Sequence, residues 1–160
     1  MKVIAMIPAR LKSTRLPEKM IQDLEGLPVI MRTYFAVLST GLFDTVYVVT
    51  DSKKIATLTR GHNVPTIESS AEHETGSDRL AEAAVTISAD IIINVQGDEP
   101  FIDKNSLSLL IECFKNDPHK QIDLASLMTP LRTEAAIVNP NTVKVITDLR
   151  GRALYFSRSA

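Results

Sequence analysis

Basic side chains and hydroxyls crowd into the segment from Pro8 to Lys19, directly after the apolar run that begins the chain. Residues 1–20 carry five lysine and arginine side chains and one acidic side chain, that of Glu18, which gives this stretch a local charge of +4. Arginine forks and lysine point charges suit a triphosphate, whose oxygens need several donors at once. The segment contains no glycine, so it is neither a P-loop nor a dinucleotide-binding turn. We call residues 8–19 the basic loop and interpret it as an anion-binding loop that binds through its side chains. The alternative is that the basic loop is only solvated surface.

A carboxylate follows a second apolar run, at residues 91–95, in the sequence Gln96-Gly97-Asp98-Glu99-Pro100. Mg²⁺ binds few protein carboxylates and takes its other ligands from water and phosphate oxygens. Asp98 therefore predicts a magnesium site, and Gly97 lets the backbone turn or approach a ligand closely. The alternative is a turn in which Asp98 only caps backbone amides.

Residues 72–79 form a third polar segment that leads into a predicted helix. His73 stands between two glutamates, but no second histidine or cysteine lies at metal-ligand spacing. The sequence therefore favours a structural role for His73 over a metal-binding one. A capped helix start is the simplest alternative for the whole segment.

Short apolar runs alternate with stretches of helical period and predict the elements that position these segments. Strands are expected at Lys2–Ile7, Asp44–Thr50 and Asp90–Val95, and with weaker patterns at Val64–Ile67, Leu124–Met128 and Thr142–Thr147. Helices are expected from Pro28 to Ser39, from Asp51 or Ser52 to Arg60, from Ser77 or Asp78 to Ile87, and after Asp103.

This alternation predicts an α/β fold with an open, mainly parallel sheet and flanking helices, in one domain over residues 1–160. An antiparallel hairpin is expected near the C-terminus, from 142–147 and 152–157. Ligands of such sheets bind beyond the carboxyl ends of the strands, and the segments after residues 7 and 95 lie there.

Bulk properties narrow the function classes. The 160 residues carry a formal charge of −1, which gives no reason to expect nucleic-acid binding. The sequence contains no apolar run of about eighteen residues, so it predicts no membrane-spanning helix. Cys113 is the only cysteine, which excludes an internal disulfide and fits a reducing compartment, so we expect a cytoplasmic protein.

Six segments, taken together and in order, resemble the 3-deoxy-manno-octulosonate cytidylyltransferase family. They are Ile7-Pro8-Ala9-Arg10, Ser13-Thr14-Arg15-Leu16-Pro17 with Lys19, Gly76-Ser77-Asp78-Arg79, Asn94-Val95-Gln96-Gly97-Asp98-Glu99-Pro100, Asn139-Pro140-Asn141 with Val143-Lys144-Val145, and Ala153-Leu154-Tyr155-Phe156-Ser157-Arg158. The resemblance implies a nucleotide-diphosphosugar-transferase-like fold. It also implies a reaction in which CTP and the sugar acid give the CMP-sugar acid and diphosphate, for lipopolysaccharide synthesis.

The resemblance also assigns roles to residues of this chain. It implies Mg²⁺ as the cofactor, held by Asp98, with Arg10, Lys19 and Asp98 in catalysis. It places Gln96 and Arg158 at the sugar acid. The CTP-binding positions that it implies are Arg10, Ser13, Arg15, Lys19, Ser77 and Arg79.

Two departures accompany the resemblance. Glu18 and Met20 stand where the family usually has glycine and proline, so the loop is expected to bend differently and to carry an extra negative charge. The chain corresponds to about two-thirds of a family member, and the resemblance places the second metal carboxylate and much of a homodimer interface in the remainder. The 160-residue chain alone is therefore expected to show little synthesis. The rival functions are a cytidylyltransferase for another nonulosonic or amino-substituted sugar acid, and a non-catalytic nucleotide-binding module.

Overall fold

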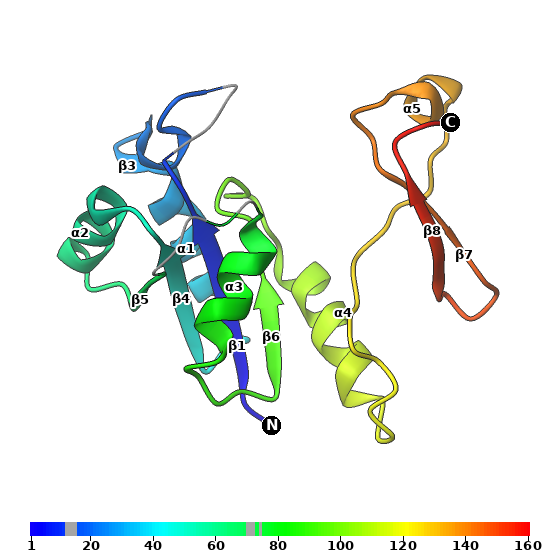
Figure 1. The fold of residues 1–160 in the computed structure, drawn as a ribbon, viewed down its shortest axis with the longest axis horizontal. Coiled ribbons are helices and arrows are strands. Elements are labelled where there is room, and N and C mark those ends of the chain that lie inside the picture. The colour runs from blue at the N-terminus through cyan, green and yellow to red at the C-terminus, as the bar shows by residue number, and fades with distance from the viewer. Residues whose placement is uncertain (12–15, 70–72, 74) are drawn as a thin grey trace. The chain divides into compact units, whose positions relative to one another are not determined.

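The computed structural model describes residues 1–11, 16–69, 73 and 75–160, and a four-stranded parallel sheet forms the centre of its first 125 residues (Figure 1). The strand order is β5 (Thr66–Glu68), β4 (Thr45–Thr50), β1 (Val3–Ala9) and β6 (Ile91–Asn94). All seven residues of β1 are buried, as its continuous apolar sequence indicates for a strand covered on both faces. The predicted open parallel α/β sheet is confirmed.

Helices cover both faces of this sheet and bury two apolar clusters. The helices are α1 (Val29–Ser39), α2 (Lys53–Gly61), α3 (Gly76–Ala84) and α4 (Lys104–Lys115). The odd-numbered residues of β1 pack with side chains of α1, α2 and α4, whereas Ile4 and Met6 pack with Leu80 and Ala83 of α3. The alternation of β1 between the two clusters follows from the two-residue period of a strand.

The helix starts follow the expected capping chemistry, with one correction. Ser52 caps α2, and Asp103 caps α4 by accepting hydrogen bonds from Ser106, which lower the pKa of the Asp103 carboxyl. The helix expected from Ser77 or Asp78 to Ile87 is α3, which begins at Gly76, ends at Ala84 and is capped by Thr75. The Thr75 hydroxyl accepts from the Asp78 amide while the Asp78 carboxylate accepts from the Thr75 amide, a reciprocal capping box.

Short elements connect β1 to α1. They are a 3₁₀ turn η1 (Lys19–Ile21) and a two-stranded ribbon of β2 (Asp23–Leu24) and β3 (Leu27–Pro28). The helix expected to begin at Pro28 begins one residue later, with Pro28 as its cap. Within the described chain, no helix is long and apolar enough to cross a membrane.

Residues 126–160 form a second compact unit, which follows the unit of residues 1–125 in the sequence. It holds α5 (Glu134–Val138) and a hairpin of β7 (Lys144–Thr147) and β8 (Ala153–Ser157), which confirms the predicted antiparallel pair. The strand expected at Leu124–Met128 is wrong, because that stretch is irregular and spans the boundary between the two units. The single domain expected over residues 1–160 stays a prediction.

Candidate functional site

Lys19 and Asp98 meet at the carboxyl edge of the sheet. The ammonium Nζ of Lys19 lies 2.5 Å from the Oδ2 of Asp98, and the two side chains are 38% and 37% exposed. Lys19 begins η1, which follows β1, and Asp98 lies in the turn that follows β6. Since β1 and β6 are parallel neighbours, their carboxyl ends bring these residues together across 79 positions of sequence. The edge thus presents a cation and a carboxylate side by side to solvent.

Close packing at Gly97 fixes the position of Asp98. A side chain at Gly97 would place its Cβ 2.9 Å from the Sδ of Met20 and 3.0 Å from the carbonyl oxygen of Pro8. The buried hydroxyl of Thr33, on α1, donates a 2.8 Å hydrogen bond to the carbonyl oxygen of Gly97. The turn after β6 is therefore held by β1, η1 and α1 together. Because Met20 follows Lys19 directly in η1, its packing against Gly97 also fixes the backbone at Lys19.

The start of α3 approaches the same edge. A Cβ on Gly76 would lie 3.2 Å from the ring of Pro8 and 4.0 Å from the Oε1 of Gln96. The side-chain Nε2 of Gln96 donates a 3.1 Å hydrogen bond to the Oδ1 of Asn94. The three segments that the sequence singled out therefore converge beside the end of β1, as far as their described residues show.

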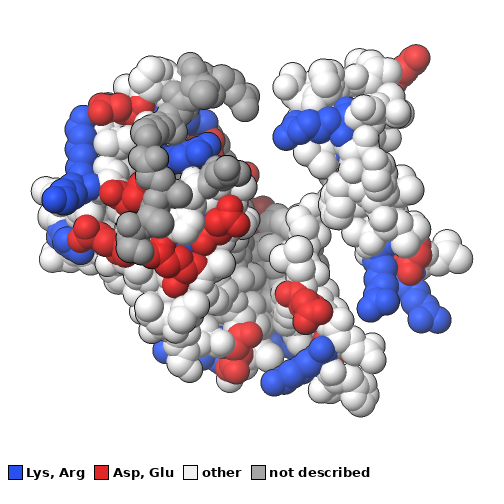
Figure 2. Space-filling model, viewed as in Figure 1, with Lys and Arg blue, Asp and Glu red and all other residues white. Residues whose placement is uncertain are grey.

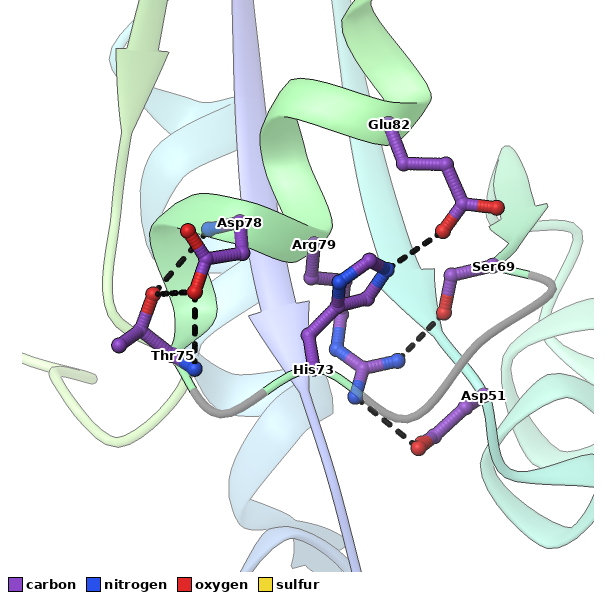
Figure 3. Close-up of polar contacts among 7 residues, drawn as sticks. All are labelled: Asp51, Ser69, His73, Thr75, Asp78, Arg79 and Glu82. Atoms are coloured by element: carbon purple, nitrogen blue, oxygen red, sulfur yellow. Dashed lines mark hydrogen bonds and ion pairs between the residues drawn. The ribbon is translucent and has the colours of Figure 1, made fainter.

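Arg79 ties the strand ends to α3 (Figure 3). Its side chain is 3% exposed, and its guanidinium donates to the Oδ2 of Asp51 at 3.0 Å and to the hydroxyl of Ser69. Asp51 follows β4 and Ser69 follows β5, so the buried guanidinium of Arg79 links the ends of two strands to α3. Sequence reasoning assigned Arg79 to CTP but did not find these partners. A contact between Arg79 and a nucleotide stays a prediction.

His73 pairs with Glu82 of α3, at 2.6 Å between Nε2 and Oε2 (Figure 3). This pairing is the kind of structural role that the sequence favoured for His73. Across the described residues, no three histidine, cysteine or acidic side chains gather into a group that could hold a metal ion.

The other predicted site residues are distributed as follows. Arg10 follows β1 and is exposed, and Ser77 is exposed in the first turn of α3. Ser13 and Arg15 lie outside the described residues. Arg158 belongs to the second unit, where its guanidinium donates to the carbonyl oxygens of Pro140 and Asn141, both at 3.3 Å.

Glu18 adopts the left-handed conformation, with φ of 53° and ψ of 27°. Glycine is the residue that adopts this region without steric cost. The glutamate adopts this region nonetheless, and a bend of the loop that differs from the resembling family stays a prediction. Figure 2 shows acidic and basic side chains interspersed on the visible face of the first unit, so an anion bound there would depend on individual side chains.

Comparison with known proteins decides the family. A family model described as Cytidylyltransferase matches residues 4–160. The chain belongs to the cytidylyltransferase family. The resemblance drawn from the sequence motifs is thereby confirmed.

Relatives and a solved structure refine this membership. The chain is 55% identical to a 3-deoxy-manno-octulosonate cytidylyltransferase of Flavobacterium johnsoniae and 54% identical to one of Christiangramia forsetii, over 99% and 98% of this chain. It spans 65% and 63% of the lengths of those two proteins. A solved structure of CMP:2-keto-3-deoxy-manno-octonic acid synthetase complexed with CTP is 35% identical, with a TM-score of 0.86 over 99% of this chain and 65% of the other.

Proposed function

We propose that the protein transfers a cytidylyl group from CTP to 3-deoxy-manno-octulosonate, forming the CMP-sugar acid and diphosphate. The observation that carries the proposal is the Lys19–Asp98 pair at the carboxyl edge of the sheet, in a chain that is 55% identical to a cytidylyltransferase of that name. The structural neighbour at TM-score 0.86, complexed with CTP, supports the choice of nucleotide.

The proposed chemistry is an in-line displacement at phosphorus. The anomeric hydroxyl of the sugar acid attacks the α-phosphorus of CTP, a new P–O bond forms, and the bond to the leaving diphosphate breaks. The hydroxyl proton is lost to solvent, and negative charge develops on the diphosphate. Lys19 and Arg10 are the described cations at this edge that could stabilise that charge, because donors placed before the reaction lower the barrier most.

Asp98 is the proposed magnesium ligand. Mg²⁺ is commonly held by one or two carboxylates and by substrate phosphates, so a single half-exposed carboxylate at the sheet edge fits the ion. The described residues offer no group of three histidine, cysteine or acidic side chains, so the other ligands would be water, the nucleotide phosphates and the second carboxylate that the resemblance implies. Bound magnesium would supply positive charge to the phosphate oxygens.

The sugar acid is proposed to lie near Gln96, which faces the start of α3 next to Asp98. The resemblance also assigns Arg158, whose guanidinium fork suits a carboxylate, and that assignment stays a proposal. We also propose that the enzyme is a cytoplasmic homodimer and that its product is used in lipopolysaccharide synthesis.

Release of diphosphate, measured with a coupled assay on the full-length gene product, tests this function. CTP with 3-deoxy-manno-octulosonate should give rapid Mg²⁺-dependent release, and CTP alone should give none. Faster release with an amino-substituted or nonulosonic acid would move the substrate to a sister class. CTP binding without release for any sugar acid would overturn the enzymatic proposal.

A further inference from the structure

Glu18 and Lys54 form an ion pair between the basic loop and α2. The Nζ of Lys54 lies 2.8 Å from one carboxylate oxygen of Glu18 and 3.0 Å from the other. The side chains of Lys54 and Glu18 are 58% and 46% exposed. Exposed pairs of this kind contribute little to the free energy of unfolding, so the pair needs another explanation than fold stability.

Glu18 occupies a fixed point in the backbone immediately before Lys19. Its amide donates to the carbonyl oxygen of Leu11 at 3.3 Å, and its own carbonyl oxygen accepts from the amide of Ile21 at 2.9 Å. With φ of 53°, the residue turns the chain into η1, where Lys19 reaches Asp98. Glu18 is therefore the residue directly before the cation at which we propose that the nucleotide binds, and its carboxylate contacts Lys54.

A carboxylate at this position opposes a polyanionic ligand. Neighbouring Cα atoms are about 3.8 Å apart, and charges interact over a Debye length of about 8 Å at physiological ionic strength. An unpaired Glu18 would repel a triphosphate bound at Lys19 and would also compete with it for the lysine. Its pairing with Lys54 removes both effects.

We propose that Lys54 is a positioning residue for the nucleotide site, which neutralises Glu18 and thereby keeps Lys19 available to a polyphosphate. The inference rests on the proposed function in one respect, namely that a triphosphate binds at Lys19. It assigns to Lys54 an effect on ligand affinity without any contact between Lys54 and the ligand.

Titration calorimetry on the full-length gene product tests the proposal, with CTP and inorganic tripolyphosphate as probes. Lys54→Ala should weaken both affinities about threefold to tenfold at low ionic strength, and the effect should shrink as salt is added. Lys53→Ala is the matched control, because it removes the same charge from an exposed neighbouring position of α2 and should change affinity less than twofold. In turnover assays, Lys54→Ala should raise the KM for CTP and leave kcat within about twofold.

The double variant decides between the electrostatic account and direct contact. Glu18→Gly keeps the left-handed turn, so Lys54→Ala added to Glu18→Gly should change affinity less than about twofold from that of Glu18→Gly alone. An undiminished effect of Lys54→Ala in the Glu18→Gly background would show that Lys54 acts on the ligand itself and would overturn the proposal. Equal effects of Lys54→Ala and Lys53→Ala would also overturn it. Since tripolyphosphate binding needs no cytidylyl transfer, wild-type protein that binds it without turnover contradicts the proposed function alone.

Discussion

At the scale of single residues, the proposed chemistry depends on the ion pair of Lys19 and Asp98. Both side chains are more than one-third exposed, so their ion pair by itself adds little to folding. The proposed role of the pair depends on its place at the carboxyl edge of the sheet. There Lys19 could bind phosphate oxygens of a nucleotide and Asp98 could bind the metal ion. The pair is therefore interpreted as a binding device.

Lys19→Ala should lower kcat/KM for CTP by at least about thirtyfold, equivalent to about 2 kcal/mol of transition-state stabilisation. The free energy of unfolding should change by no more than about 0.5 kcal/mol, since the side chain is exposed. Steady-state kinetics and urea denaturation measure the two quantities. Unchanged kinetics would show that the basic loop is only a solvated surface.

Arg79 has the opposite character, because it is buried and its partners belong to the protein. Arg79→Ala should destabilise the protein by about 3 kcal/mol, since it leaves Asp51 without its cation. Arg60→Ala is the control, because it breaks a 2.6 Å pair with Glu68 at the surface and should cost at most about 1 kcal/mol. Equal losses in urea denaturation would contradict a structural role for Arg79.

The sequence predicted some of these residue contacts and missed others. Asp98 could be expected near the basic loop, because both follow strands of one parallel sheet and such ends share an edge. The bonds of Arg79 to Asp51 and Ser69 could not be found, because they depend on how two strand ends register against α3. The clue available was an acidic residue directly after the strand at 45–50.

At the scale of elements, the site depends on how tightly the turn after β6 packs against β1 and η1. The relevant contacts are the backbone carbonyl oxygen of Pro8, which cannot shift cheaply, and the ends of the Met20 and Ile30 side chains. Continuous apolar runs predicted β1, β4 and β6, and β1 is buried along its whole length, as expected for a strand covered on both faces. β4 is partly buried, and β6 alternates between buried and exposed residues. The apolar pattern failed at residues 124–128, where an apolar run pairs with no strand in the described part of the chain.

Gly97→Ala should lower both stability and activity. The new methyl group would meet the Pro8 carbonyl oxygen at 3.0 Å and the Met20 sulfur at 2.9 Å, and the backbone atom cannot move aside cheaply. A loss of about 1–3 kcal/mol is expected, together with displacement of Asp98 from Lys19. Gly61→Ala, where a Cβ meets nothing within 4 Å, should leave the melting temperature and the activity near wild type. Equal behaviour of the two variants would show that the turn is not tightly packed.

At the scale of the whole molecule, two compact units divide the chain, at residues 1–125 and 126–160. The sequence anticipated the sheet of the first and the hairpin of the second, since each follows from local patterns. The boundary between the two units could not be predicted from the sequence, because no stretch rich in glycine, proline or serine separates them. Of the proposed site residues that the structure describes, only Arg158 lies in the second unit.

We expect nucleotide preference to arise in the first unit, where the described parts of the basic loop and the start of α3 converge on the end of β1. We expect kcat/KM for CTP to exceed that for ATP and GTP by at least about a hundredfold, because a pyrimidine site that hydrogen-bonds its base rejects other bases strongly. Diphosphate release with each triphosphate measures this ratio. Equal turnover with purines would indicate a general nucleotidyltransferase.

Asp98 is proposed to hold the metal of a cytidylyl-transfer site, and a comparison of two variants tests this role most directly. Diphosphate release from CTP and 3-deoxy-manno-octulosonate should be measured for Asp98→Asn in the full-length gene product, with the melting temperature recorded in parallel. Asp123→Asn, the same change at an exposed position outside the sheet edge, is the control. We predict a loss of most Mg²⁺-dependent activity for Asp98→Asn, with a melting temperature near that of wild type, because asparagine keeps the turn but lacks the charge that the cation needs. Normal turnover of Asp98→Asn at ordinary Mg²⁺ concentrations would contradict the claim, and unfolding of the variant would show that Asp98 is a structural turn residue.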